Sequence, residues 1–187
     1  MLYANVQRGI NTALMERSCV DTVVEPSVAQ AGLSDRLFTI LDLVSRGRSH
    51  SDIVEYFNST EASIYNDRAD ILAKTGALNF PHAVSAGARE GVFEPILKPG
   101  EVLRVRDLSI CLRESVLLAA RGLSLAESVR RTKMPTSEGN MSVRRSRAVK
   151  ALRAGGLPHA TRMVLEDQDH EVNNFVNSTI DISGLRV

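Results

Sequence analysis

Residues 33–57 read LSDRLFTILDLVSRGRSHSDIVEYF, and residues 108–132 read LSICLRESVLLAARGLSLAESVRRT. The two stretches align at an offset of 75 residues, which places Arg46-Gly47 on Arg121-Gly122. Self-similarity over such a length is the sequence signature of a repeated supersecondary unit. The alignment therefore predicts two copies of one unit within the 187 residues of the chain.

The similarity continues toward the C-terminal end of each copy. Phe80-Pro81-His82-Ala83 aligns with Leu157-Pro158-His159-Ala160 at an offset of 77, so the second copy contains two additional residues before this point. Proline is favoured at the first position of a helix. We therefore expect a short helix to begin at each Pro-His pair, and we interpret the two histidines as helix-start residues rather than as a pair of ligands.

Apolar residues in both copies have helical spacing. One stripe recurs at intervals of three and four residues and stops before a glycine that can close a helix; it consists of Leu37, Ile40, Leu41 and Val44. A second stripe, in the last long helix of the second copy, consists of Met141, Ala148, Val149 and Leu152. These stripes predict helices that each bury one face.

The order of the predicted helices matches the helix-turn-helix plan, in which a short turn joins two helices and the second helix is exposed. Residues 46–79, RGRSHSDIVEYFNSTEASIYNDRADILAKTGALN, resemble the LuxR-type (NarL/FixJ-like) DNA-binding domain. The resemblance rests on the glycine after the first helix, an Ile-Val pair, a Thr-Glu entry to the recognition helix, and Ile64, Ile71-Leu72 and Gly76 at the family's intervals. It extends more weakly to the second copy and implies a DNA-binding regulator.

We therefore expect a mainly α fold with two tandem LuxR-like helix-turn-helix units of three or four helices. Between them, Pro99-Gly100 is a pair that suits the centre of a type II turn, so a short β-hairpin or another ordered connector is expected. The expected division is a helical extension at 1–32, a first unit at 33–84, a connector at 85–107, a second unit at 108–164 and an acidic tail at 165–187.

Charge is distributed unevenly along the chain, although the net charge is only +1. Residues 121–153 contain nine basic and two acidic residues, whereas residues 33–84 contain five basic and seven acidic residues. The tail has an excess of four negative charges, and its Glu166-Asp167-Asp169 group is interpreted as solubilising charge. Such separation of signs indicates a basic nucleic-acid face beside acidic surfaces, or an ordinary solvated basic helix.

The candidate recognition helix of the second unit begins near Asn140. With its apolar stripe turned inward, four residues are expected to point outward and contact base edges: Ser142, Val143, Arg145 and Ser146. Five basic residues are expected to contact phosphates: Arg131, Lys133, Arg144, Arg147 and Lys150. Thr136 and Ser137 lie at the helix start, where hydroxyl and backbone amide donors favour an anionic oxygen.

The recognition helix of the first unit is less suited to DNA. Asp67 and Asp70 occupy positions where basic residues or histidine are typical of the family, and carboxylates repel phosphate. This unit is expected to contact either DNA or a protein partner through Thr60, Ser63, Tyr65, Asn66 and Arg68.

Several classes of protein and site are disfavoured. Cys19 and Cys111 have no metal-binding spacing, and no Gly-rich phosphate loop or nucleophile motif occurs, so we expect neither an enzyme nor a bound metal or cofactor. No apolar run approaches the roughly 20 residues that span a bilayer. These features favour a cytoplasmic, nucleoid-associated protein.

Two functional hypotheses follow from these observations. The first is a sequence-specific regulator of transcription, bacterial or phage in origin, that binds double-stranded DNA mainly through its basic second unit. The alternative is an interaction protein whose acidic first unit binds RNA polymerase or another regulator, with DNA binding secondary or absent. The sequence leaves open whether the chain forms a homodimer.

Overall fold

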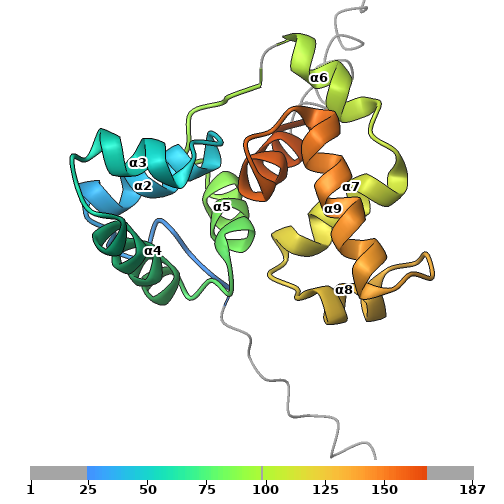
Figure 1. Cartoon of the computed structure of the whole chain (residues 1–187), viewed down its shortest axis with the longest axis horizontal. Helices are drawn as coiled ribbons and strands as arrows, with labels where there is room; N and C mark the ends of the chain where they lie inside the picture. The colour runs from blue at the N-terminus through green and yellow to red at the C-terminus, as the bar shows by residue number, and fades with distance from the viewer. Residues whose placement is uncertain (1–24, 98, 168–187) are drawn as a thin grey trace, which may run out of the picture.

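The computed structural model describes residues 25–97 and 99–167 (Figure 1). The described residues form helices and loops without a strand, which confirms the mainly α fold class. The first half contains α2 (Asp35–Ser45), α3 (His50–Tyr56), α4 (Glu61–Thr75) and α5 (Phe80–Arg89). The second half contains α6 (Pro99–Arg106), α7 (Ile110–Ala120), α8 (Leu125–Arg131), α9 (Glu138–Leu152) and a last helix over residues 157–167.

The helices repeat with the offsets that the sequence shows. α4 and α9 both contain 15 residues and begin 77 positions apart. α3 and α8 both contain seven residues and begin 75 positions apart. The two additional residues of the second copy therefore lie in the loop between α8 and α9, where they lengthen the turn that leads into α9.

The start of the second helix is built in the same way in both copies. Ser49 and Asp52 form a capping box at α3, and Ser124 and Glu127 form one at α8. In each box the serine accepts a hydrogen bond from the backbone of the acidic residue, and the carboxylate accepts one from the backbone of the serine. Two backbone donors that the helix leaves unpaired are satisfied in this way.

α4 and α9 also end in the same backbone conformation. The residue after each helix is left-handed: Gly76 has a φ of 69°, and Arg153 has a φ of 53°. Glycine adopts this conformation without steric cost, whereas a residue with a Cβ does not. The second copy therefore retains the backbone shape of the first while carrying a less suitable residue there.

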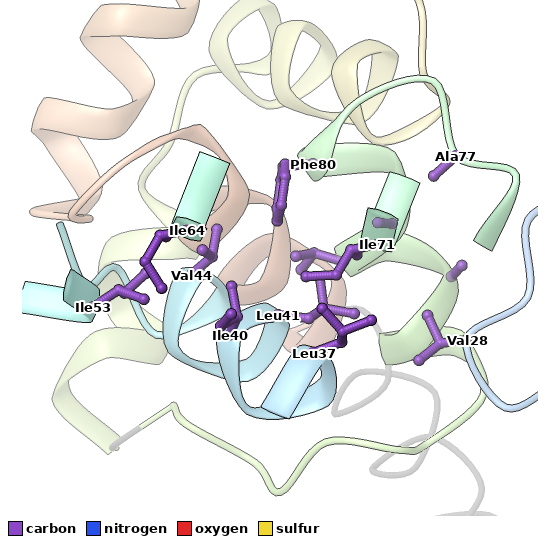
Figure 2. Packing of buried hydrophobic residues seen from close by; sticks show 13 residues of the cluster. Val28, Leu37, Ile40, Leu41, Val44, Ile53, Ile64, Ile71, Ala77 and Phe80 are labelled. Atoms are coloured by element: carbon purple, nitrogen blue, oxygen red, sulfur yellow. The ribbon is translucent and has the colours of Figure 1, made fainter. Parts of the chain in front are cut away.

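The core of the first copy lies between α2, α3, α4 and α5 (Figure 2). The stripe predicted for α2 is buried, with Ile40 and Leu41 fully inaccessible to solvent. Ile53 and Ile64 point toward this stripe from α3 and α4 (Figure 2). Phe80, at the start of α5, belongs to the same buried cluster. Burial of an aliphatic side chain of this size contributes about 1.5–3 kcal/mol.

The second copy has its own core. In α9, Met141, Ala148 and Leu152 of the predicted stripe are buried, and Val149 packs partly buried beside them. The remaining members come from α7, from the end of α6 and the loop after it, and from the last helix, and include Val105, Leu108, Val116, Ala160 and Val164.

The two copies pack against each other through their Pro-His segments. α5 contacts both α2 and α7, and it lies between the two halves in Figure 1. The ring of His82 rests on Gly122, and the ring of His159 rests on Gly47, so that a Cβ on either glycine would overlap the histidine of the other copy. Asn79 donates a side-chain hydrogen bond to the carbonyl of Gly122 at 3.0 Å. The contact is thus reciprocal.

Arg162 makes the contact between the two copies asymmetric. Its side chain is fully buried and donates hydrogen bonds to Asp42 and Ser45 of α2, to Glu166, and to the carbonyl of Glu94. The position in α5 that corresponds to it at an offset of 77 is Ser85, which is also buried. One side of the interface therefore contains a buried cation with two carboxylate partners, and the other contains a hydroxyl.

The structure corrects the expected connector. Residues 99–106, where a β-hairpin was one of two expectations, form α6, with Pro99 as its first residue. Proline suits both the second position of a turn and the first position of a helix, so the Pro-Gly pair did not discriminate between them. Val105 is fully buried and joins the core of the second copy, which favours the helix.

The two terminal segments also differ from expectation where they are described. Residues 25–32 of the expected helical extension contain turns instead of a helix, and the N–H groups of Val28 and Ala29 donate hydrogen bonds to the Glu90 carboxylate. In the expected acidic tail, Asp167 is fully buried and pairs with Arg106 and Arg113. Residues 1–24 and 168–187 lie outside the described part of the chain.

Glu166 and Asp167 are therefore not solubilising charge, as the sequence had suggested. Glu166 accepts hydrogen bonds from the N–H groups of Ile96 and Leu97 and pairs with Arg162. Both carboxylates tie the last helix to preceding segments. Asp169 of the same group is outside the described residues. Within the described ranges, every helix is too short or too polar to span a bilayer.

Candidate nucleic-acid interface

α9 presents one face to solvent because its other face packs on α7 and α8. Three residues predicted to point outward do so: Ser142, Val143 and Ser146 are exposed, and 46% of the Val143 surface is accessible. Arg147 and Lys150 are exposed on the next turns of the same face. Two hydroxyls, one methyl-bearing side chain and two cations therefore follow one another along the outside of α9.

Arg145 does not point outward, and this part of the prediction is wrong. Its Nη2 atom donates hydrogen bonds to the carbonyl of Leu123 at 3.1 Å and to the hydroxyl of Ser128 at 2.7 Å. Burial lowers the pKa of the guanidinium. Arg145 is four residues after Met141 and three before Ala148, so it lies within the buried stripe and turns toward α8.

Arg68 occupies the corresponding position of the first copy and is also turned inward. Its guanidinium lies over the Phe80 ring, 4.4 Å from the centroid, and burial lowers its pKa. Arg68 is half-buried in this position, and its contact with a partner stays a prediction. In both copies this arginine joins its helix, α4 or α9, to another element of the same copy.

Glu114 of α7 fixes the loop that leads into α9. Its carboxylate accepts a hydrogen bond from the Lys133 N–H at 3.0 Å and one from the Thr132 hydroxyl at 2.7 Å. The hydrogen bond from Lys133 lowers the pKa of Glu114 most, and the charges of Arg144 and Lys133 lower it further. Arg144 is half-buried and faces this carboxylate, so it is less accessible to phosphate than was predicted.

Thr136 and Ser137 lie at the start of α9, as the sequence indicates. Ser137 is exposed and caps the helix by accepting a hydrogen bond from the Asn140 N–H at 3.3 Å. The Thr136 hydroxyl oxygen is buried and has no hydrogen-bond partner among the described residues, so Ser137 carries the exposed hydroxyl at this helix start. The first turn of α9 thus presents a hydroxyl and unpaired backbone N–H groups where an anionic oxygen is favoured.

Exposed basic residues occur in α9, in α8 and in the segments that follow α7, α8 and α9. Within the described ranges they form no ion pair, and they are Arg121, Arg130, Arg131, Lys133, Arg147, Lys150 and Arg153. Arg121, Arg130 and Arg153 contribute to the regional charge excess, but spacing along α9 alone did not single them out. Only the count of basic residues over 121–153 included them.

The same face of the first copy has a different character. At an offset of 77, Tyr65 takes the place of Ser142, Asn66 that of Val143 and Asp70 that of Arg147. Tyr65 and Asn66 are exposed as expected, and the Tyr65 ring lies 4.3 Å from the His50 ring.

Three other polar residues of the first copy have structural partners. Thr60 caps α4 by accepting a hydrogen bond from the N–H of Ser63. Asp67 pairs with Arg36 at 2.8 Å. These contacts position α4, and they leave Tyr65, Asn66 and Asp70 as its outward polar face.

The histidines of the Pro-His segments have structural roles. Nδ1 of His82 accepts a hydrogen bond from the Leu78 N–H at 3.4 Å, and Nδ1 of His159 accepts one from the Gly155 N–H at 3.1 Å. This is the helix-start role that the repeat indicated. No cluster of three or more metal-ligating side chains occurs within the described ranges.

Comparison of the chain with models of protein families, with curated proteins and with solved structures gave no match.

Proposed function

We propose that the protein is a DNA-binding regulator of transcription that inserts α9 into the major groove of double-stranded DNA. The observation that carries the proposal is the outward face of α9, which combines exposed serines and Val143 with Arg147 and Lys150. A major groove about 12 Å wide admits one helix, whose leading side chains reach base edges and whose flanks reach phosphates. The LuxR-type resemblance of the sequence supports the same function.

The proposed roles follow from exposure. Val143 contacts a thymine methyl group, and Ser142 and Ser146 donate to or accept from base edges. Arg147, Lys150, Arg131 and Lys133 contact phosphates, because they are exposed and form no ion pair among the described residues. Arg145 positions α9 against α8 and reads no base.

The first copy has a separate candidate role, which its surface favours. Tyr56 and Tyr65 are 66% and 60% exposed, and Tyr56 lines a hollow together with Asp52 and Glu55. Tyrosine is enriched at protein interfaces because it combines a large apolar ring with a polar end. We propose that this copy contacts a protein partner, such as RNA polymerase or another regulator, while the second copy binds DNA.

The test begins with selection of bound fragments from genomic DNA, followed by titration of the best fragment at several salt concentrations. We expect log Kd to depend linearly on log salt, with a slope of about 0.9 per phosphate contact. Arg147→Ala with Lys150→Ala should lower the slope by about 1.8 and weaken binding at every sequence. Val143→Ala should instead relax the preference at one base position.

A matched control exists in the first copy. Asp70→Ala with Lys74→Ala changes two exposed charged residues on α4 and should leave DNA affinity within about twofold. Circular dichroism checks that each variant is folded. If the Arg147 and Lys150 variant binds DNA with unchanged affinity and slope, α9 is not the DNA-binding helix.

A further inference from the structure

A groove between α7 and α8 lies outside the proposed base-reading face. It has a volume of about 360 Å³ and is lined by Ile110, Arg113, Glu114, Leu117, Leu118, Arg121, Arg131 and Lys133. We call it the α7–α8 groove. Ile110, which also lines it, is 76% exposed. Leu117 and Leu118 give the groove an apolar floor.

The charge in this groove is mostly uncompensated and positive. Arg113 is paired with the buried Asp167 at 3.0 Å. Glu114 is held by the hydrogen bonds from Thr132 and Lys133. Arg121, Arg131 and Lys133 form no ion pair among the described residues. The groove therefore suits a ligand that brings one apolar side chain and more than one carboxylate.

A surface of that kind exists at the equivalent place on the first copy. Asp52, Glu55 and Tyr56 lie three and four residues apart on one side of α3, are all exposed, and line a hollow of about 430 Å³ together with Leu43 and Arg48. We call these three residues the α3 ridge. At an offset of 75, Tyr56 corresponds to Arg131 of the groove. Leu43 likewise corresponds to Leu118, so the two hollows overlap at two equivalent positions. The exposed charges of the hollow on the first copy, Asp52, Glu55 and Arg48, leave one net negative charge there.

We propose that the α3 ridge of one molecule docks into the α7–α8 groove of a second molecule of the same chain. Tyr56 lies on Leu117 and Leu118, and the carboxylates of Asp52 and Glu55 face Arg121 and Arg131. The hydrogen bond that the Asp52 carboxylate accepts from the Ser49 N–H fixes its position at the start of α3. Complementary charge of this kind determines orientation and raises the rate of association.

The contact joins two different surfaces, so it leaves one ridge and one groove free in every dimer. Such heterologous contacts extend into open chains unless rotation closes a ring. A ridge of one short helix buries less area than a standard interface, so the association is weak and salt-dependent. It does not require DNA, and its central cation, Arg121, is not among the residues proposed to bind DNA.

Sedimentation velocity of the full chain without DNA tests the proposal. At about 50 mM salt the mean sedimentation coefficient should rise with protein concentration up to about 300 µM, and at about 500 mM salt it should not. Tyr56→Arg and Arg121→Glu should each weaken self-association at least tenfold. Lys74→Glu changes an exposed cation elsewhere, on α4, and should leave self-association unchanged.

Mixing the two defective variants gives the decisive result. Tyr56→Arg retains an intact groove and Arg121→Glu retains an intact ridge, so a mixture should form dimers and no larger species. Three results would overturn the proposal: a wild-type chain that stays monomeric at low salt, variants that associate like the wild type, or a mixture that stays monomeric. None of these outcomes depends on whether α9 binds DNA.

Discussion

α4 and α9 have the same length, the same capping plan and the same buried positions, yet they differ on the outside. Ile64 and Met141 take equivalent inward positions, and both are fully buried. Asp70 and Arg147 take equivalent outward positions and have opposite charges. The interior of the unit restricts which residues fit, whereas the outward positions tolerate a reversal of charge. Two copies with the same fold can therefore bind different partners.

The largest expected effect concerns the unequal pair Arg162 and Ser85. Arg162→Ala removes a buried cation and leaves Asp42 and Glu166 without that partner, so we expect a loss of about 3–5 kcal/mol in the free energy of unfolding. Ser85→Ala, at the equivalent position, should cost less than about 1.5 kcal/mol. Urea denaturation followed by circular dichroism measures both. Equal losses would mean that the interface is energetically symmetric.

A second comparison uses three glycines with positive φ. Gly47 and Gly122 have φ values of 81° and 80°, and each also lies against a histidine ring of the other copy. Gly47→Ala or Gly122→Ala should therefore cost about 2–4 kcal/mol, from backbone strain and overlap together.

Gly76 is the control for the previous pair, because its φ is 69° and no atom would meet an added Cβ. Gly76→Ala should cost only the backbone term, about 1–2 kcal/mol. If all three variants lose the same stability by urea denaturation, the reciprocal contacts with His82 and His159 contribute nothing.

The two histidines predict a smaller, pH-dependent effect. Burial lowers the pKa of His82 and of His159, so the unfolded chain binds protons more readily than the folded one. Stability should therefore be constant above pH 7.5 or so and decline as the pH falls through about 6.5, the pKa of an unperturbed histidine. Unfolding experiments at several pH values measure the decline. It should become shallower in His82→Gln with His159→Gln, and an unchanged decline would assign it to other groups.

The smallest effect concerns the ends of α4 and α9. Arg153→Gly gives α9 the residue that α4 has at the same left-handed position, and should stabilise the chain by about 1 kcal/mol. The thermal unfolding midpoint should rise by a few degrees. A lower midpoint would show that the Arg153 side chain contributes more than its backbone conformation costs.

The helices and their buried faces could be predicted because they depend on local spacing. The stripe of Leu37 to Val44, the repeat offsets and the starts at Ser49, Ser124, Pro81 and Pro158 are all visible in the sequence. α6 was not distinguished from a hairpin, because Pro99-Gly100 suits either and burial of Val105 against the second core favours the helix.

The side chains that depend on distant partners could not be predicted. Arg145 and Arg68 lie three and four residues from buried positions of their helices, which is the spacing of the inward face, but their charge favoured an outward position. Their partners, Ser128 and Phe80, lie outside these helices. Arg162 and Asp167 appear in the sequence as ordinary surface charges. Their partners are up to 120 residues away along the chain. A local sequence pattern does not predict a contact between residues so far apart.

α5 is buried along residues 80–87, although its sequence contains few large apolar side chains. It belongs to the first copy by connectivity and covers α7 of the second. A fragment that contains only one copy therefore lacks part of the surface against which its helices pack. Expressed as separate fragments, each copy should aggregate or remain poorly ordered, and refolding the two together should restore cooperative unfolding, as in fragment complementation.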